Sequence, residues 1–150
     1  MDNYVLIQEN DFQKARRKIN EARKNGKAVI FSSNDDELNR KILEKENVDC
    51  LLINLAGRKD RMKQRDSGFN HVLAKAAKAK NVTIGINLDE IASSQGKEKS
   101  EILARVRQNI KLCNKNKLKM TFISKEKQDT YNLKSLGLVL GMPTWMTKEI

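Results

Sequence analysis

The sequence predicts an α/β protein built as an incomplete or shortened TIM-like (β/α) barrel, with about five βα units and parallel strands. Five short apolar runs recur along the chain, and each is followed by a pattern typical of a helix. Their centres lie 23 to 37 residues apart, close to the ~30 residues of a βαβ unit. The runs are continuous rather than alternating, as in strands that are buried on both faces of a sheet. They occupy residues 4–7, 28–31, 50–55, 82–88 and 120–123.

The length of the chain limits how much of a barrel it can form. With 150 residues and 39% hydrophobic content, the sequence suits a single domain over residues 1–150 with its own core. A complete eight-fold barrel normally needs at least ~200 residues, so five units are too few. The sheet should therefore stay open, and its exposed edge must be covered by a helix, a tail or a partner.

The first two helices have clear start signals. Either Asn10 or Asp11 can cap the first helix, which should end near Gly26. Its apolar face consists of Phe12, Ala15, Ile19 and Ala22. Asn34 and Glu37 resemble a capping box at the start of the second helix. The apolar positions that follow this box are Leu38 and Ile42.

The later helices are defined mainly by their apolar periodicity. Asp66 or Ser67 can cap the third helix. Its predicted buried face consists of Phe69, Val72, Leu73, Ala76 and Ala77. The fourth helix has a buried stripe formed by Ile102, Leu103, Val106, Ile110 and Cys113. A last short helix is predicted over residues 133–140, ending at Gly141 and the only proline, Pro143.

Composition argues against several classes of protein. No run is long and apolar enough to span a bilayer, and the first residues have neither the cationic nor the apolar part of a secretory leader. Cys50 and Cys113 lie far apart at apolar positions, so we expect two free thiols in the core of a protein from a reducing compartment. These features predict a cytoplasmic protein with no membrane partner.

The positive charge is concentrated in two segments. Residues 56–80 and 97–119 each hold eight Lys or Arg against two Asp or Glu, which gives each segment a net charge of +6. The whole chain has a net charge of +11, so the remainder is close to neutral. Charge confined in this way is typical of a protein that binds a polyanion. We therefore expect a nucleic acid as the partner, rather than the less favoured alternative of an anionic membrane.

The first basic segment begins with a cationic loop between a strand and a helix. Its cations are Arg58, Lys59, Arg61, Lys63 and Arg65. Three arginines favour phosphate contact, because a guanidinium group can pair with two phosphate oxygens. Aromatic residues make up 5% of the chain and none lies in this loop. Recognition of the backbone and shape of a folded RNA is therefore expected, rather than stacking on single-stranded bases.

Two helices extend the predicted RNA surface. On a helical wheel, His71 lies with Lys75 and Lys78 opposite the apolar face of the third helix, so it should be solvated or face RNA. On the fourth helix, basic residues recur every four positions opposite the buried stripe. This basic ridge, which either contacts RNA or is simply exposed, consists of Arg107, Lys111 and Lys115.

Few residues are candidates for catalysis. The chain has one histidine, so a His-containing metal site or a Ser-His-Asp triad would have to use His71. Asp89 and Glu90 follow the fourth strand directly, where α/β barrels place their active sites, but they equally suit a helix cap and a first-turn acid. We predict no catalytic residue, no metal and no cofactor. The alternatives are a metallohydrolase that uses Asp89, Glu90 and His71, and a scaffold whose basic surface binds an acidic protein.

Three longer sequence motifs follow one another along the chain. They are Arg65-Asp-Ser-Gly-Phe-Asn-His-Val-Leu-Ala-Lys75, Asn81-Val-Thr-Ile-Gly-Ile-Asn-Leu88 and Arg107-Gln-Asn-Ile-Lys-Leu-Cys113. The shorter motifs around them are Gly57-Arg-Lys-Asp60, Tyr131-Asn-Leu-Lys134 and Leu140-Gly-Met142. In order and spacing, these motifs closely resemble the archaeal and eukaryotic ribonuclease P protein component 3 family, the 30-kilodalton subunit. The resemblance is specific from about residue 50 to 143 and weak before that.

The resemblance implies an RNA-binding protein subunit of ribonuclease P, the ribonucleoprotein that removes the 5′ leader of precursor tRNA with its RNA as the catalyst. It also implies a barrel that is related to the polymerase and histidinol phosphatase metallohydrolases but lacks a working metal site. The implied partners are the ribonuclease P RNA and the component 2 protein, and indirectly precursor tRNA and the other ribonuclease P proteins.

The resemblance also implies particular RNA contacts. They carry over to Arg58, Lys59, Arg65, His71, Lys75, Arg107 and Lys134. Lys134 stands where the family commonly has Arg, which would weaken a bidentate contact. An insertion over residues 61–64 lengthens the loop and leaves open whether Arg58 or Arg65 holds the family's position. Family members are usually longer, so the chain resembles a barrel trimmed at both ends.

Overall fold

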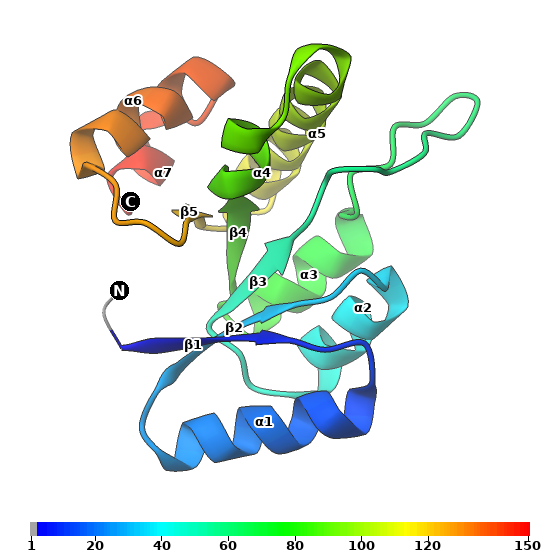
Figure 1. The fold of residues 1–150 in the computed structure, drawn as a ribbon, viewed down its shortest axis with the longest axis vertical. Coiled ribbons are helices and arrows are strands. Elements are labelled where there is room, and N and C mark those ends of the chain that lie inside the picture. Colours follow the sequence, from blue (N-terminus) through cyan, green and yellow to red (C-terminus); the bar gives the residue numbers. More distant parts are fainter. Residues whose placement is uncertain (1–2) are drawn as a thin grey trace.

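Five parallel strands form one sheet at the centre of the molecule (Figure 1). The computed structural model describes residues 3–150. The strands are β1 (Tyr4–Gln8), β2 (Ala28–Ser32), β3 (Cys50–Ile53), β4 (Thr83–Asn87) and β5 (Met120–Ile123). They lie in the order β1-β2-β3-β4-β5, and every neighbouring pair is parallel. This topology confirms the predicted α/β class with five βα units, and strand ends differ from the predicted ones by at most two residues.

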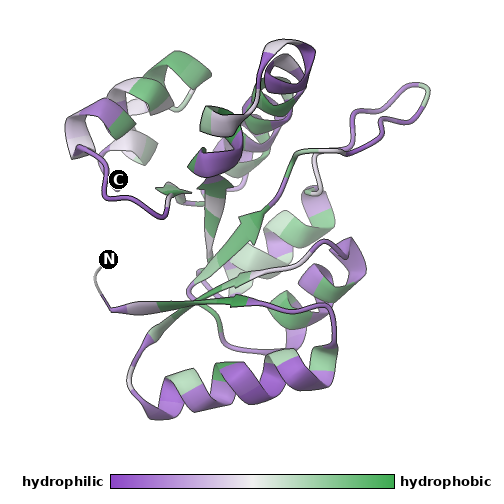
Figure 2. Cartoon of the chain, viewed as in Figure 1, coloured by the Kyte–Doolittle hydropathy of each residue, from purple (hydrophilic) through white to green (hydrophobic). Residues whose placement is uncertain are grey.

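Helices cover the outer side of the sheet, and those that precede β5 connect its strands (Figure 1). They are α1 (Phe12–Lys24), α2 (Asp36–Lys45), α3 (His71–Ala79), α4 (Leu88–Ser93), α5 (Gly96–Lys115), α6 (Thr130–Leu140) and α7 (Thr144–Thr147). Purple stretches on the helices in Figure 2 mark their hydrophilic positions, while the strands are mostly green. Such strands are typical of a parallel sheet that is buried on both faces.

The two faces of the sheet pack differently. Because side chains alternate along each strand, one set points outward to the helices and the other into the concave side. The outward set joins the main core through Phe31, Leu51, Ile53, Ile84, Ile86 and Met120. The inward set forms a smaller buried cluster of Ile30, Cys50 and Leu52, with Tyr4 and Ile123 packed against it.

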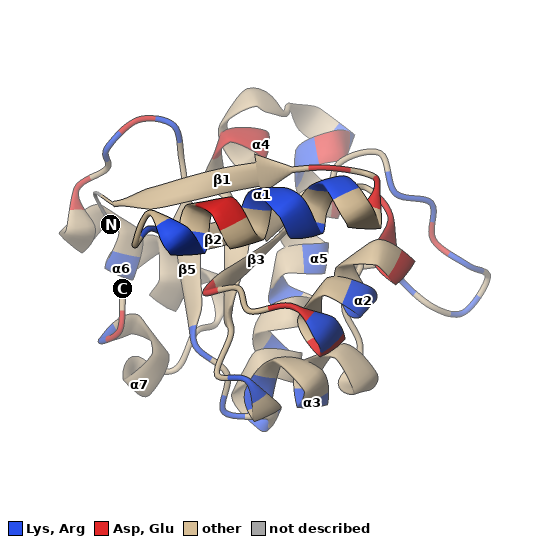
Figure 3. Cartoon of the chain, turned by 90° about the horizontal axis from the view of Figure 1, so that it is seen from below, with Lys and Arg blue, Asp and Glu red and all other residues tan. Residues whose placement is uncertain are grey.

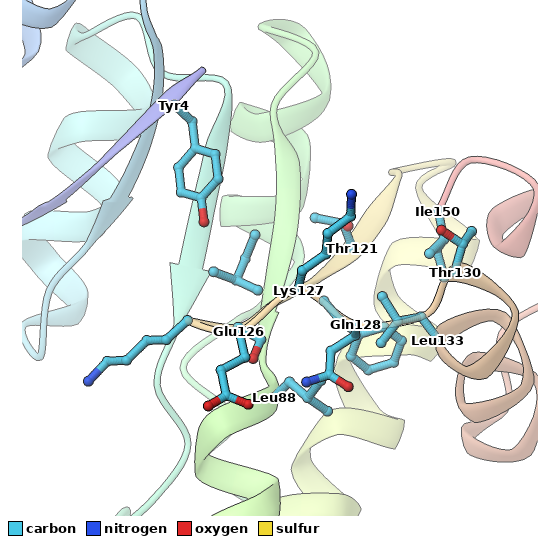
Figure 4. A pocket seen from close by; sticks show the side chains of 13 residues that line it. Tyr4, Leu88, Thr121, Glu126, Lys127, Gln128, Thr130, Leu133 and Ile150 are labelled. Atoms are coloured by element: carbon cyan, nitrogen blue, oxygen red, sulfur yellow. The ribbon is translucent and has the colours of Figure 1, made fainter. Parts of the chain in front are cut away.

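The sheet is strongly curled. Tyr4 on β1 and Ile123 on β5 belong to opposite edge strands, yet both line one cavity of about 380 Å³, which Figure 4 shows. In a flat sheet these strands would be four spacings of ~4.8 Å apart, too far to line one small cavity. Gly85 permits the curvature, since a Cβ there would lie 3.0 Å from the Cys50 Sγ and 3.2 Å from the Ile123 Cγ1. The curl is that of an incomplete TIM-like barrel.

The structure settles the starts of the first two helices. Asp11, one of the two predicted caps, accepts a 3.1 Å hydrogen bond from the backbone N–H of Lys14 and begins α1. The predicted capping box of Asn34 and Glu37 is wrong. Asp35 caps α2 instead, because its carboxylate accepts hydrogen bonds from the backbone N–H groups of the first turn.

The third helix begins later than predicted. Neither Asp66 nor Ser67 caps it, because the Asn70 side chain accepts the 3.0 Å hydrogen bond from the N–H of Leu73. Gly68, whose φ is +68°, interrupts the chain between the predicted caps and the helix. The predicted buried face is wrong at Val72, which is exposed on the helix. Phe69 is buried as predicted, but it lies ahead of the helix.

Two short helices in the second half of the chain were not predicted as separate elements. The first, α4, starts directly after β4 and includes Asp89 and Glu90 in its first turn. The second, α7, follows Pro143. The predicted helix at 133–140 starts three residues earlier, because Asp129 caps it, and it ends at Gly141 as expected.

Both thiols have the predicted environment. Cys50 and Cys113 are free and buried. Burial raises the pKa of each thiol to about 12, and the nearby Asp49 charge adds to the shift at Cys50. Within residues 3–150, no helix combines the length and the hydropathy that crossing a membrane requires.

Candidate nucleic-acid interface

The cationic loop, residues 57–67, joins β3 to α3 at the carboxyl ends of the strands. It projects away from the body of the protein (Figure 1), and Figure 3 shows blue segments along most of it. At its outer end the chain turns back on itself. The backbone N–H of Arg61 donates to the Gln64 carbonyl at 2.9 Å, and the N–H of Gln64 donates to the Arg61 carbonyl at 3.2 Å.

Arg58 is held inside the base of this loop. Its guanidinium makes a bidentate contact with the Asp36 carboxylate at 2.9 and 3.0 Å, and it also contacts Asp66 at 3.2 Å. The Nε–H donates to the Asn54 carbonyl at 2.7 Å, and only 11% of the side chain is exposed. Burial opposes the charged form, but the hydrogen bonds and charges of the two carboxylates outweigh it and raise the pKa of Arg58.

Gly68 allows Arg58 to lie so deep. A Cβ at position 68 would lie 2.6 Å from the Cζ of Arg58, and the φ of +68° already disfavours other residues. The Asp66 carboxylate accepts a 3.0 Å hydrogen bond from the Gly68 N–H, so the same acid holds both the turn and the arginine. Asp66 is therefore part of the loop's anchor and not a helix cap.

A second arginine, Arg105 on α5, holds the start of the loop against α5. Its guanidinium donates to the carbonyls of Leu55 and Arg58 at 3.2 and 2.8 Å, and to the Asp60 carboxylate at 3.1 Å. Only 3% of its side chain is exposed. Asp60 also accepts a 2.8 Å hydrogen bond from the Asp66 backbone N–H. That bond, and then the Arg105 guanidinium, hold the pKa of Asp60 below its ordinary value.

Amide side chains of α5 complete this support. Gln108 donates to the Arg65 carbonyl and the Ser67 hydroxyl, both at 3.2 Å. Asn109 donates to the Ser67 carbonyl at 3.1 Å and is buried. The loop therefore rests on α5 at both of its ends, which fixes the position of the chain between them.

The four remaining cations of the loop are exposed. They are Lys59, Arg61, Lys63 and Arg65. None of the ion pairs found within residues 3–150 includes any of them. Arg61 and Arg65 also line a cleft of about 330 Å³ between the loop and the N-terminal ends of α2 and α3. Four unpaired cations on a braced loop form a surface that suits phosphate groups.

The helix residues that were predicted to contact RNA lie on α3, α5 and α6. His71 and Lys75 are exposed on α3, which packs against α5, and the Lys78 ammonium donates to the Lys117 carbonyl just after α5. The exposed ridge on α5 is formed by Arg107, Lys111 and Lys115. Lys134 is half-buried on α6, on the other side of α5 from the loop and α3 (Figure 1). The structure thus groups the loop, α3 and α5 positions, and it separates Lys134 from them.

The carboxylates of the enzyme alternative have structural partners. Asp89 accepts hydrogen bonds from the Ser124 hydroxyl and the Lys125 N–H, and Glu90 accepts them from backbone N–H groups of the β3–α3 connection. Among the residues described, no group of three or more His, Cys, Asp or Glu side chains lies close enough to hold a metal ion. Asp89, Glu90 and His71 therefore do not assemble into the site that a metallohydrolase would need.

Sequence reasoning missed the side chains that brace the loop. The largest omission is Arg105, which lies one position from the predicted stripe residue Val106, and the buried Asn109 adjoins Ile110 in the same way. Each lies three positions after a stripe residue, Ile102 or Val106, so helical periodicity could have placed both on the buried face. A polar pair within that stripe was the available signal. The roles of Asp36 and Asp66 had no such signal, because Arg58 lies in a loop, 22 residues after Asp36 and 8 before Asp66, so no helix or strand periodicity relates them.

Comparison with known proteins places nearly all of the chain in one family. The family model described as RNase P subunit p30 matches residues 3–147. The chain is 28% identical to ribonuclease P protein component 3 of Methanothermobacter thermautotrophicus over 138 residues, which cover 92% of this chain and 54% of the relative. It is also 28% identical to the protein of the same name from Methanocaldococcus jannaschii, with 87% and 53% covered. The chain thus spans about half the length of the curated relatives that it matches.

A solved structure shares the fold. It is a chain in the cryo-EM structure of archaeal ribonuclease P with mature tRNA, with a TM-score of 0.77 and 23% sequence identity. The match covers 96% of this chain and 62% of the other. At that identity the likeness shows the fold, which agrees with the curled parallel sheet described above.

Proposed function

This chain belongs to the RNase P subunit p30 family, and we propose that it acts as an RNA-binding protein subunit of ribonuclease P. In this role it supports the catalytic RNA in removing the 5′ leader of precursor tRNA. The observation that carries the proposal is the braced cationic loop, in which four exposed cations have no protein partner within the described chain. A surface of this kind binds phosphates without needing to reorganise.

The exposed Lys and Arg side chains, together with the imidazole of His71, are the proposed RNA contacts. In the loop they are Lys59, Arg61, Lys63 and Arg65, and on the helices His71, Lys75, Arg107 and Lys111. Arg58 has a different proposed role, because protein acceptors already take four of its hydrogen bonds. It supports RNA binding by holding the loop. Of the two arginines that could hold the family's loop position, exposure favours Arg65 as the phosphate contact. Lys134 would contact a separate part of the RNA.

The proposed partners follow from the same assignment. They are the ribonuclease P RNA and the component 2 protein, and through them precursor tRNA and the other ribonuclease P proteins. We propose that component 2 binds away from the cationic loop and the ridge on α5, because both carry charge suited to RNA. Protection of the loop against hydrogen exchange by component 2 alone would reverse this assignment of surfaces.

Salt-dependent binding tests the proposal. The loop variant replaces Lys59, Arg61, Lys63 and Arg65 with Ala, and its affinity for the ribonuclease P RNA of the same organism is measured between about 50 and 500 mM salt. Each phosphate interaction that the substitutions remove should lower the slope of log K against log salt by ~0.7 to 0.9. The loop variant should therefore bind more weakly and with a flatter salt dependence.

A charge-matched control separates this surface from general basicity. It replaces four exposed cations on and next to α1, namely Lys14, Arg17, Lys24 and Lys27, so that both variants lose four charges. The control should keep most of the affinity and slope of the wild type. Equal losses in the two variants, with both proteins folded, would show that the loop is no more than part of a diffuse positive charge.

A further inference from the structure

The tip of the cationic loop carries an exposed apolar side chain. Met62 is 98% exposed, more than any other large hydrophobic residue in the described chain. It lies in the two-residue turn closed by the paired hydrogen bonds between Arg61 and Gln64, with Lys63 beside it. Figure 2 shows the loop in hydrophilic colours along most of its length, apart from its outer end.

The fold itself does not explain a methionine at this position. Met62 has no place in either hydrophobic cluster of residues 3–150. The turn does not require it, because the only non-glycine residues with positive φ in that range are Asn81 and Lys117. Residue 62 thus has an ordinary backbone conformation that most amino acids can adopt. A long apolar side chain held fully in water gains free energy from any partner surface that covers it.

The loop presents this side chain in a fixed setting. Arg105 holds the first half of the loop through Asp60, and Gln108 holds the second half through the Arg65 carbonyl. The hydrogen bonds between Arg61 and Gln64 close the outer end. A partner that contacts the tip therefore does not have to order the backbone first. Exposed cations on both sides of Met62 mean that such a partner is rich in negative charge close to the apolar contact.

We propose that residues 61–63 form a finger that enters a non-helical segment of RNA, where Met62 packs on an unstacked base and Arg61 and Lys63 pair with the flanking phosphates. The proposal rests on the function proposed above and assigns one base contact to a surface that otherwise binds phosphates. Base faces are accessible in loops and bulges but not inside an A-form helix, so the finger selects single-stranded segments. The flexible, polarisable thioether adapts to any base face.

Substitution of Met62 tests the base contact. Met62→Ala should weaken binding to the ribonuclease P RNA of the same organism by about five- to tenfold at every salt concentration, because the apolar side chain that covers the base is removed. The slope of log K against log salt should stay unchanged, since every phosphate interaction remains. Met62→Leu should bind like the wild type, and Met62→Gln should bind like Met62→Ala.

Two variants at other positions serve as comparisons. Arg61→Ala should lower both the affinity and the slope, because it removes a phosphate interaction. Val139→Ala, which shortens an exposed apolar side chain on α6, is the control and should change neither quantity.

Chemical probing of the RNA bases supplies the second readout. At least one unpaired base should lose reactivity when the wild type or Met62→Leu binds, and should keep its reactivity with Met62→Ala. If Met62→Ala binds as the wild type does while the four-cation loop variant loses affinity, the finger is wrong and the proposed function stands. If the wild type fails to bind the RNA, both are wrong. A weaker interaction of Met62→Ala with component 2, with RNA binding unchanged, would overturn the proposal in favour of a protein contact.

Discussion

The base and the tip of the cationic loop carry the same kinds of side chain in opposite environments. At the base, Arg58 and Arg105 are almost fully enclosed, and each binds at least one carboxylate. At the tip, Arg61 and Lys63 are exposed and have no ion pair within residues 3–150. Loop charge alone does not distinguish a residue that binds a partner from one that positions it. Burial and the acceptors nearby make that distinction.

The difference between base and tip has a consequence for how mutations should act. Substitutions at the base should lower the stability of the protein and change the salt dependence of RNA binding little. Substitutions at the tip should flatten the salt dependence and change stability little. Stability and salt dependence are measured independently, so each residue of the loop can be assigned to one class.

Removal of the Arg105 guanidinium should have the largest effect on stability. Arg105→Met keeps the apolar part of the side chain but leaves Asp60 and the carbonyls of Leu55 and Arg58 without their donor. The expected loss in the free energy of unfolding is roughly 2–4 kcal/mol, because a buried donor to three acceptors is removed. Urea denaturation of the variant measures it. A loss under about 0.5 kcal/mol would mean that the loop is not held from α5.

Arg58 and Arg65 form the direct test of base against tip. Arg58→Met should cost about 2 kcal/mol of stability, since it breaks an enclosed bidentate ion pair whose carboxylates are only partly hydrated. Arg65→Met should change stability by less than about 0.5 kcal/mol and lower the salt slope of RNA binding by ~0.7 to 0.9. The pattern with the two residues exchanged would place the phosphate contact at Arg58.

Two glycines at either end of the same loop give a matched pair. Gly57 and Gly68 both have positive φ, but a Cβ at 57 would meet nothing within 4 Å, whereas a Cβ at 68 would collide with the Arg58 guanidinium. Both Ala variants carry the backbone penalty of about 1 kcal/mol, and Gly68→Ala should cost about 1 kcal/mol more because of the collision. Urea denaturation of the two variants measures the difference.

A double-mutant cycle isolates the collision. In the background of Arg58→Ala, the additional cost of Gly68→Ala over Gly57→Ala should disappear, because the atoms that collide are gone. If the difference persists, some other contact of Gly68 determines it, and the close packing of Arg58 on this glycine does not stabilise the loop.

The sequence predicts the exposed part of the cationic loop better than the side chains that support it. Five apolar runs at βαβ spacing were enough to predict the parallel sheet, and a run of cations was enough to locate the loop, because both signals are local. The support depends on pairs that are distant in sequence, such as Arg105 with Asp60 and Arg58 with Asp36. No periodicity encodes such pairs.

The misplaced start of the third helix has the same origin. Asp66 is a good cap by residue type, but its carboxylate accepts hydrogen bonds from Arg58 and from the Gly68 N–H, so it is not available for a helix. Asn70 then caps α3 four residues later. The intrinsic preference of Asp66 for a cap position is therefore outweighed by its contact with Arg58, which the sequence pattern does not show.

The smallest expected effect concerns the charge of Asp60. The Asp66 backbone N–H and then Arg105 lower its pKa in the folded protein below the ordinary 3.8. The folded state therefore favours the ionised carboxylate, and this contribution to stability is fully present above pH 3.8 and is lost as the pH falls through the lower folded-state pKa.

The variant Asp60→Asn tests this contribution, because it keeps an oxygen that can accept hydrogen bonds but removes the charge. Denaturation of both proteins between about pH 7 and pH 2.5 should show a constant difference in stability down to about pH 4, and a shrinking difference below it. Because the other carboxylates titrate in both proteins, their effect cancels in the difference. A difference that stays constant at every pH would mean that the geometry of the hydrogen bonds, and not the charge of Asp60, holds the base of the loop.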